Sequence, residues 1–449
     1  MSLDDPLILE GGNSVARGKI SDDAHRLAEY LATRGLGDGD AISVDATPTV
    51  AYCTMFMASI LHGIRLMPIA PSLPVKLRAE RELAVRVRDA LSAHELADLV
   101  RARHSAPLKR SRTHLNSGGL VIGTSGSGGQ PKLVFLPNLA LRDAAQSGAA
   151  RVGFQQGHVW HASLPLHHVG GAMILMRALA GNAAIRLAPP PRRWSDLKGC
   201  THASLVPTQL AGLLDDPSDP PSSLVAILLG GAPSSQSLRD RAVARGVPLY
   251  ASYGLTESCG QIAACRVQRG DPATLAGPAI GNTEIRIDVE PDSAAGIGEI
   301  LLEGPVLAEG NYVDGSVVPQ AVPFRTRDAG FLDAAGRLHV VGRLDAMFIS
   351  GGRNIHPETI ERALCELSCV RSACVVGVPH AKWGMRPVAF VDLCDAPPQP
   401  LATLLAESLE RFMIPDTYFA LPADEIAAMK PSRARLAARL AAGERFDPL

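Results

Sequence analysis

The chain has almost no net charge. Its 44 lysines and arginines are balanced by 45 aspartates and glutamates, which leaves a formal charge of −1 over 449 residues. This balance argues against a protein that binds nucleic acid or an anionic membrane through a strong overall field. One basic run, at residues 101–112, contains no aromatic side chain. We expect that run to be a solvated surface.

The sequence also lacks a signal-peptide pattern and a long hydrophobic run. It begins Met-Ser-Leu-Asp-Asp, which is acidic rather than basic. The apolar stretch at residues 50–61 is shorter than the roughly 20 residues of a membrane helix, so we expect a buried helix there. Eight cysteines are scattered, and the cluster Cys365, Cys369 and Cys374 does not have zinc-site spacing. A cytoplasmic protein without a membrane partner is expected.

Glycines and hydroxyl side chains are concentrated in residues 121–134, which read VIGTSGSGGQPKLV. Glycines let the backbone turn and approach a ligand, and turned N–H groups bind anionic oxygens. The order of residues fits neither a Walker loop nor a nucleophile elbow. The run therefore predicts a phosphate-binding loop of another kind, with a plain surface turn as the alternative. Its candidate contacts are Thr124, Ser125, Gly126, Ser127, Gly128, Gly129 and Lys132.

Short apolar runs alternate with amphipathic stretches between residues 119 and 252. This alternation predicts an α/β domain in which helices pack on parallel sheet. The expected strands are 159–164, 183–187, 203–206, 225–229 and 248–251, and the expected helices are 169–180, 207–214 and 234–244.

The pattern changes after Gly277. Short strands at 284–289, 298–303 and 337–341 predict a small β subdomain. The last hundred residues predict a small α+β unit, with a helix at 357–367, strands at 372–378 and 387–393, and more helix from Leu401. We therefore expect an N-terminal domain over residues 1–344 and a C-terminal domain over residues 345–449.

A second motif, Tyr253-Gly254-Leu255-Thr256-Glu257, follows the strand expected at 248–251. A loop at the carboxyl end of a strand is where α/β sheets place ligands. A flat aromatic ring, a hydroxyl and a carboxylate suit a base, a phosphate and Mg²⁺ respectively. Alone, this motif is weak, and its pairing with the glycine-rich loop makes it specific.

Three further motifs lie in the second half of the chain. Arg325-Thr326-Arg327-Asp328 is followed by Gly342-Arg343-Leu344-Asp345, and Asp328 with Arg343 can hold a ribose or a phosphate. An ordinary surface ion pair is the alternative there. The run 350–361 places a glycine turn before a helix that starts at Pro357. Lys430 lies in a Met-Lys-Pro-Ser-Arg turn before an amphipathic segment.

These five motifs, in this order, resemble those of the adenylate-forming enzymes, the acyl-CoA synthetase superfamily. The likeness extends over nearly the whole chain. Residues 165–171, 201–209 and 342–361 resemble in particular a branch of aryl-CoA ligases. The resemblance implies an ATP-dependent acid–thiol ligase that uses Mg²⁺ and CoA and has two domains joined by a hinge.

The resemblance also implies roles for individual residues. The loop 124–132 would bind the β- and γ-phosphates of ATP, Thr256 the α-phosphate and Glu257 the Mg²⁺. Tyr253 would hold adenine together with a second glycine-rich turn. The residues of that turn are Gly230, Gly231 and Ala232.

Asp328 and Arg343 would hold the ribose, and Lys430 would bridge the substrate carboxylate and the α-phosphate. Asp345 would be the hinge about which the C-terminal domain rotates between the two half-reactions. Residues 350–352 would then line the channel for the thiol.

The acid-binding pocket is the least determined part of the prediction. His168 is a candidate catalytic residue or substrate contact, although a histidine at such a turn is packed structure at least as often. Ser204 and Gln209 are weaker candidates. Arg177 is a possible partner for a second carboxylate, but a helical arginine is more often at the surface.

Two other functions fit the same motifs. One is a stand-alone adenylation enzyme that loads a carrier protein, since its first half-reaction is identical. The other is a nucleotide-binding protein that has lost catalysis, which Gly128, Leu133 and Met429 favour because they depart from the family pattern.

Overall fold

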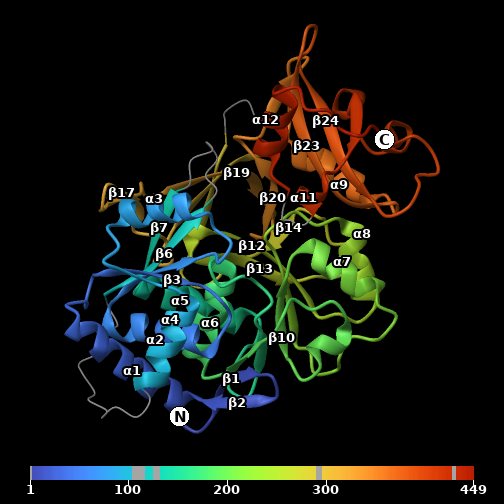
Figure 1. Cartoon of the computed structure of the whole chain (residues 1–449). Helices are drawn as coiled ribbons and strands as arrows, with labels where there is room; N and C mark the ends of the chain where they lie inside the picture. The colour runs from blue at the N-terminus through green and yellow to red at the C-terminus, as the bar shows by residue number, and fades with distance from the viewer. Residues whose placement is uncertain (1–2, 104–116, 125–131, 290–295, 427–430) are drawn as a thin grey trace.

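The computed structural model describes residues 3–103, 117–124, 132–289, 296–426 and 431–449. Figure 1 shows a large unit that contains the N-terminus and a smaller unit, orange to red, seated at one end of it. Three sheets and their helices build the large unit, and a fourth sheet builds the small one. This arrangement confirms the predicted fold class, an α/β domain with a β subdomain followed by a small α+β domain.

An eight-stranded sheet, in the order β13-β12-β11-β10-β8-β9-β1-β2, forms one layer of the large unit. Its central strands are parallel, while β13 and β2 pair antiparallel at the two edges. The predicted strands between residues 159 and 251 all belong to it. The strands are β1 Pro6–Glu10, β2 Asn13–Ala16, β8 Val159–His161, β9 Ala184–Leu187, β10 His202–Leu205, β11 Ala226–Leu229, β12 Leu249–Leu255 and β13 Gly260–Arg266.

A seven-stranded sheet forms a second layer, in the order β18-β17-β7-β6-β4-β3-β5. Its parallel half, β3 to β6, continues into an antiparallel hairpin of β6 and β7. The strands are β3 Ala41–Asp45, β4 Arg65–Ile69, β5 Asp89–Leu91, β6 Gly119–Thr124, β7 Lys132–Pro137, β17 Gly310–Val313 and β18 Ser316–Pro319.

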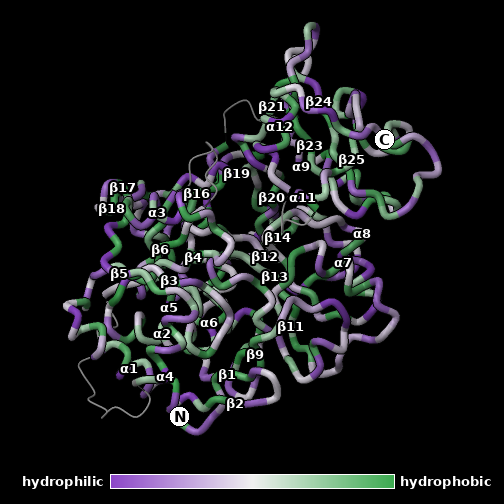
Figure 2. The backbone as a smooth tube through the Cα atoms, viewed as in Figure 1, coloured by the Kyte–Doolittle hydropathy of each residue, from purple (hydrophilic) through white to green (hydrophobic). Residues whose placement is uncertain are grey.

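Helices fill the space between and around these sheets. The largest apolar core joins α1, α2, α5 and α6 to both sheets, and a second core lies beneath α7 and α8. Helix α2 is buried along almost its whole length, as predicted for residues 50–61. Figure 2 shows hydrophobic residues along β9 and β11 and more hydrophilic ones around β17 and α3. The helices are α1 Arg17–Thr33, α2 Val50–His62, α3 Val75–Val85, α4 Ala93–Arg103, α5 Asn138–Arg151, α6 Val169–Gly181, α7 Pro207–Asp215 and α8 Gln236–Ala244.

The predicted β subdomain is a five-stranded antiparallel sheet, in the order β14-β20-β19-β16-β15. In the sequence, its strands come after β13 of the eight-stranded sheet and before the strands of the C-terminal unit. Its strands are β14 Leu275–Gly277, β15 Glu284–Asp288, β16 Gly298–Glu303, β19 Phe324–Leu332 and β20 Leu338–Arg343.

The C-terminal unit is a small sheet covered by short helices, with its own apolar core around β23, β24 and α9. Its strands are β21 Phe348–Ser350, β22 Arg353–Ile355, β23 Val370–His380, β24 Gly384–Leu393 and β25 Thr417–Ala420. Its helices are α9 Pro357–Glu366, α10 Leu401–Leu405, α11 Ala423–Ile426 and α12 Arg433–Ala441. The helix predicted from Leu401 is therefore short.

The structure also bears on membrane-spanning helices, cysteines and groups of metal-ligating side chains. None of the helices in the described ranges is both long and apolar enough to cross a membrane. All eight cysteines are free thiols, and Cys53, Cys200, Cys259, Cys369 and Cys374 are buried. Within the described residues, no group of three or more His, Cys, Asp or Glu side chains is arranged to hold a metal ion.

Candidate nucleotide and acid site

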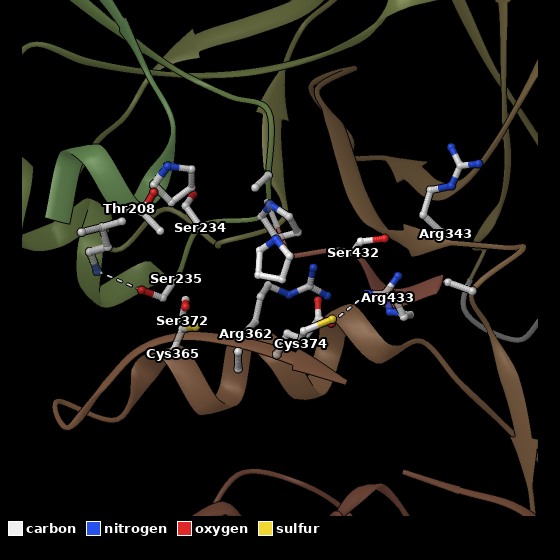
Figure 3. Close-up of a pocket in the computed structure, with 18 of the residues that line it drawn as sticks. Thr208, Ser234, Ser235, Arg343, Arg362, Cys365, Ser372, Cys374, Ser432 and Arg433 are labelled. Carbon is white, nitrogen blue, oxygen red and sulfur yellow. Dashed lines mark hydrogen bonds and ion pairs between the residues drawn. The ribbon is translucent and has the colours of Figure 1, made fainter. Parts of the chain in front are cut away.

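A cleft of about 1450 Å³ lies between the large unit and the C-terminal unit. Figure 3 shows side chains from both units that face one another across it. The large unit lines it with residues from several of the predicted nucleotide motifs. These are Thr124, Lys132, Ala232, Thr256, Glu257 and Arg343. The C-terminal side contributes residues 431–433 and parts of α9 and β23, with Asp345 at the junction.

The predicted phosphate loop connects two paired strands. Thr124 is the last residue of β6, Lys132 is the first of β7, and the two face each other in the antiparallel register. Both line the cleft. Ser125, Gly126, Ser127, Gly128 and Gly129 lie outside the described residues, as does Lys430.

Tyr253, Asp328 and Arg343 form one chain of hydrogen bonds. The Tyr253 hydroxyl donates to Asp328 Oδ2 at 2.5 Å, and Arg343 Nη1 donates to Asp328 Oδ1 at 3.1 Å. Asp328 on β19 faces Arg343 on β20 in the sheet register. Burial, and then the Asp328 carboxylate, raises the pKa of Tyr253, so its hydroxyl remains a donor at neutral pH. Three residues predicted to contact the nucleoside thus lie together.

The expected loop position of Tyr253 is wrong. Strand β12 runs on from Leu249 to Leu255, because β13 pairs with it antiparallel as far as Leu255. Only Thr256 and Glu257 leave the sheet, in a short 3₁₀ turn. The strand therefore carries the tyrosine, and the turn carries the hydroxyl and carboxylate into the cleft.

The second glycine-rich turn follows β11 and needs its glycines. A Cβ on Gly230 would lie 2.7 Å from the Ser252 hydroxyl, which itself donates to Leu229 O. Gly231 has a φ of +79°, in the left-handed region that side chains avoid. The turn brings Ala232 to the wall of the cleft.

Arg177 is buried, and the expectation that it lies at the surface is wrong. Its side chain is 3% exposed, on a helix whose residues from Gly171 to Ala178 are all buried. Its Nη2 donates to Gln261 Oε1 at 3.2 Å, and its guanidinium lies 5.1 Å from the centre of the Trp160 ring. Burial lowers its pKa to about 10.

No carboxylate pairs with Arg177 among the residues that the structure describes. Arg177 Nε and Gln261 Nε2 are both buried without a hydrogen-bond partner there. A Cβ on Gly148 would lie 3.1 Å from both Arg177 Nε and Gln261 Oε1, so a side chain at this position would crowd both groups. A buried cation with two unused donors beside it suits an anionic ligand.

The three other acid-site candidates differ in which partners their side chains contact. His168 precedes α6 and lies beside His167, with 4.3 Å between ring centres. Ser204 Oγ accepts the indole N–H of Trp160 at 3.2 Å. Gln209 Oε1 accepts the backbone N–H of Val206 and so caps α7. Ser204 is near Arg177 through their shared neighbour Trp160.

Sequence reasoning missed several charged residues of the C-terminal unit. Arg433 lines the cleft, donates to Val375 O and pairs with Glu358 and Glu361. Those two carboxylates raise its pKa against the opposing effect of burial. The signal was present, because Arg433 ends the Lys-Pro-Ser-Arg run, but its partners are 58 or more residues away in the sequence.

Comparison with protein families decides the affiliation. The model of the AMP-binding enzyme family matches residues 78–312, and that of the AMP-binding enzyme C-terminal domain matches residues 359–428. The chain belongs to the AMP-binding enzyme family. The predicted resemblance to the adenylate-forming superfamily is therefore confirmed, and the two matched segments fall within the two predicted domains.

Relatives across most of the chain carry one name. A 2-succinylbenzoate–CoA ligase of Salmonella typhimurium is 32% identical, with 89% of this chain and 86% of the relative covered. The enzyme of that name from Haemophilus influenzae is 31% identical, with 92% and 90% covered. The branch of aryl-CoA ligases that the sequence resembles is thus that of the 2-succinylbenzoate–CoA ligases.

Solved structures of the same branch have the same fold. An arginine-to-lysine variant of Escherichia coli MenE with bound OSB-AMS superimposes with a TM-score of 0.83 at 26% identity, covering 98% of this chain and 96% of the other. Bacillus subtilis o-succinylbenzoate CoA synthetase in complex with the acyl-adenylate OSB-AMP gives 0.85 at 25% identity, covering 99% and 97%.

Proposed function

We propose that this protein is an AMP-forming 2-succinylbenzoate–CoA ligase. In the first half-reaction the acid's carboxylate attacks the α-phosphorus of ATP, giving an acyl-adenylate and pyrophosphate. In the second, the thiol of CoA attacks the acyl carbon and AMP leaves. Neither step needs a covalent enzyme intermediate, so positioning and charge neutralisation carry the catalysis. The reaction would belong to menaquinone biosynthesis in the cytoplasm.

The observation that carries the choice of acid is the buried Arg177. A charged guanidinium held away from water without a carboxylate partner is destabilising on its own. 2-Succinylbenzoate has two carboxylates, so one can react while the other pairs with Arg177. Gln261 Nε2 would donate to the same carboxylate. A monocarboxylic acid would leave both groups unsatisfied.

The residues that line the cleft support a set of proposed contacts with ATP. In this proposal Thr124 and Lys132 bind the β- and γ-phosphates with the loop between them, and Thr256 binds the α-phosphate. Tyr253 and the turn at residues 230–232 hold adenine, while Asp328 and Arg343 hold the ribose. Lys430 bridges the reacting carboxylate and the α-phosphate.

Glu257 fits the proposed Mg²⁺ site. It is a carboxylate on the cleft wall, and Mg²⁺ bound to nucleotide commonly takes one or two carboxylates together with phosphate oxygens and waters. Mg²⁺ bound there would neutralise charge on the departing pyrophosphate. Glu257 itself supplies a hard oxygen ligand fixed by the turn after β12.

The proposed reaction needs two arrangements of the C-terminal domain. Rotation about Asp345 would withdraw Lys430 after adenylation and bring residues 350–352 to the thiol channel. His168 and Ser204 would border the acyl group, and so would Gln209, which lies in the first turn of α7. CoA is the proposed thiol, and the pantetheine arm of a carrier protein is the alternative.

Pyrophosphate release tests the proposal. Purified protein is given ATP, Mg²⁺ and a set of acids that includes 2-succinylbenzoate, benzoate and 4-phenylbutyrate. Release should depend on the acid and be at least tenfold faster with 2-succinylbenzoate than with either monocarboxylate. Adding CoA or a pantetheine-loaded carrier protein then identifies the thiol by the thioester formed. Equal rates with the monocarboxylates would reject the role of Arg177, and no release with any acid would reject the ligase.

A further inference from the structure

Helix α9 of the C-terminal unit contacts the large unit through two side chains on one face. Arg362 and Glu366 are four residues apart, so they lie one above the other on the helix. Helix α9 packs against both α8 and β20. In Figure 1 it lies on the side of the C-terminal unit that faces α8.

Glu366 caps the first turn of α8. Its Oε1 accepts the backbone N–H of Gln236 at 2.5 Å, and its Oε2 accepts that of Ser237 at 2.8 Å. These are the first two residues of the helix, whose N–H groups have no partner within the helix. The Ser235 hydroxyl accepts from Leu238 N. A carboxylate 130 residues away thus completes a cap that Ser235 makes only in part.

Arg362 makes the second contact of this face. Its Nη2 donates to the carbonyl oxygen of Val341 on β20 at 2.9 Å and to Thr359 Oγ1 at 3.3 Å. The two contacts reach separate elements of the large unit, β20 and α8. Together they join α9 to both of these elements.

The orientation held by these contacts fits the adenylation step of the proposed function. Residues 431–433, which follow Lys430 directly, line the same cleft as Lys132 and Glu257. Residues 350–352 are not among the described residues that line it. Instead, the backbone N–H of Gly351 donates to the carbonyl oxygen of Trp383, which also belongs to the C-terminal unit.

We propose that Glu366 is a positioning residue for the first half-reaction. By capping α8 it stabilises the domain orientation in which residues 431–433 line the nucleotide cleft. The cap must break before the C-terminal domain can rotate for thioester formation. This inference rests on the two half-reactions of the proposed function.

The test compares Glu366→Ala and Glu366→Gln with a surface control. Glu410→Gln serves as the control, because Glu410 is exposed and pairs only with Arg353 within the C-terminal unit among the described residues. The acid-dependent ATP–pyrophosphate exchange reports the first half-reaction. Thioester formation from synthetic acyl-adenylate reports the second.

Exchange should fall about fivefold in Glu366→Ala, the equivalent of one lost helix cap, and by less in Glu366→Gln, which retains one acceptor oxygen. Thioester formation should be unchanged or faster. Equal loss in both half-reactions, or no loss in either, would overturn the proposal. Glu410→Gln should match the wild type.

Hydrogen exchange gives a readout that does not depend on activity. The amides of Gln236 and Ser237 should exchange faster in Glu366→Ala, while the amides of β23 and β24 keep their protection. Unchanged exchange at α8 would show that the cap does not form in solution and would overturn the proposal. If the wild type activates no acid but shows this protection, the proposed function fails while the contact stands.

Discussion

Arg343 and Asp345 form a two-point ion pair at the junction of the two units. Arg343 Nε donates to Asp345 Oδ1 at 2.9 Å, and Nη2 donates to Oδ2 at 2.7 Å. The same guanidinium reaches Asp328 through Nη1. Asp345 is the predicted hinge and Arg343 a predicted ribose contact. The predicted hinge is therefore tied, in this orientation, to a predicted ribose contact.

Asp345→Ala should shift the balance between the half-reactions without unfolding the protein. The pair is partly exposed, with side chains 36% and 25% accessible, so its loss should cost less than about 1 kcal/mol of unfolding free energy. Since this ion pair is present in the orientation that we assign to adenylation, pyrophosphate exchange should fall more than thioester formation from the adenylate. Both rates and the melting temperature are measured. A larger loss in thioester formation would contradict this reading.

Asp328→Ala should weaken ATP binding more than Tyr253→Phe does. The first variant removes a carboxylate that accepts from both Tyr253 and Arg343, whereas the second removes a single donor. Hydrogen bonds to charged groups contribute about 1.5–3 kcal/mol, so the KM for ATP should rise roughly 10- to 100-fold in Asp328→Ala. The KM for the acid should change little in both. An unchanged KM for ATP in Asp328→Ala would remove that residue from the nucleotide site.

Much of the fold follows from the alternation of apolar runs, and the differences have physical causes. The predicted helix at 169–180 corresponds to α6, and the strand at 225–229 to β11. Strand β12 extends further than expected because β13 pairs with it. The end of β12, from Ser252 to Leu255, contains polar residues and a glycine and so gives no strand signal of its own. Its pairing with β13 is seen only in the folded chain.

The burial of Arg177 had a signal in the sequence. The segment around it, Val169 to Gly181, contains only apolar residues and glycine apart from the arginine. A helix that is apolar all round is buried, so its single charge must be buried too. The general preference of helical arginines for the surface does not apply to such a helix. The contact of Glu366 with α8 had no comparable signal, because it depends on how two separately folded units meet.

Arg177→Met should leave the protein as stable as the wild type or more so. Burial lowers the pKa of Arg177 to about 10, which means that the charged form is disfavoured where it stands. Replacing a buried charge with an apolar side chain of similar length is often neutral or stabilising by about 1–4 kcal/mol. Denaturant unfolding at pH 7.5 measures the change.

The same variant should lose recognition of the dicarboxylic acid. The KM for 2-succinylbenzoate should rise at least tenfold, while the KM for ATP stays within about twofold. The double variant Arg177→Met with Gln261→Met is the companion, since the single change leaves the Gln261 oxygen without its donor. A fall in unfolding free energy of more than about 2 kcal/mol in the double variant would instead identify Arg177 as a structural residue.

His161→Leu should flatten the pH dependence of stability. His161 is fully buried, neither ring nitrogen has a partner among the described residues, and burial followed by Arg186 lowers its pKa to about 4. Between pH 6.5 and pH 4 the unfolded chain therefore binds a proton that the folded chain does not, so stability falls as the pH falls through this window. The shift corresponds to at most about 3 kcal/mol. Denaturant unfolding at pH 7.5 and 5.0 should show a smaller difference in the variant, whereas His94→Ala, at a site 84% exposed, should behave as the wild type. An unchanged difference in His161→Leu would mean that His161 is already protonated, or paired, in the native protein at pH 5.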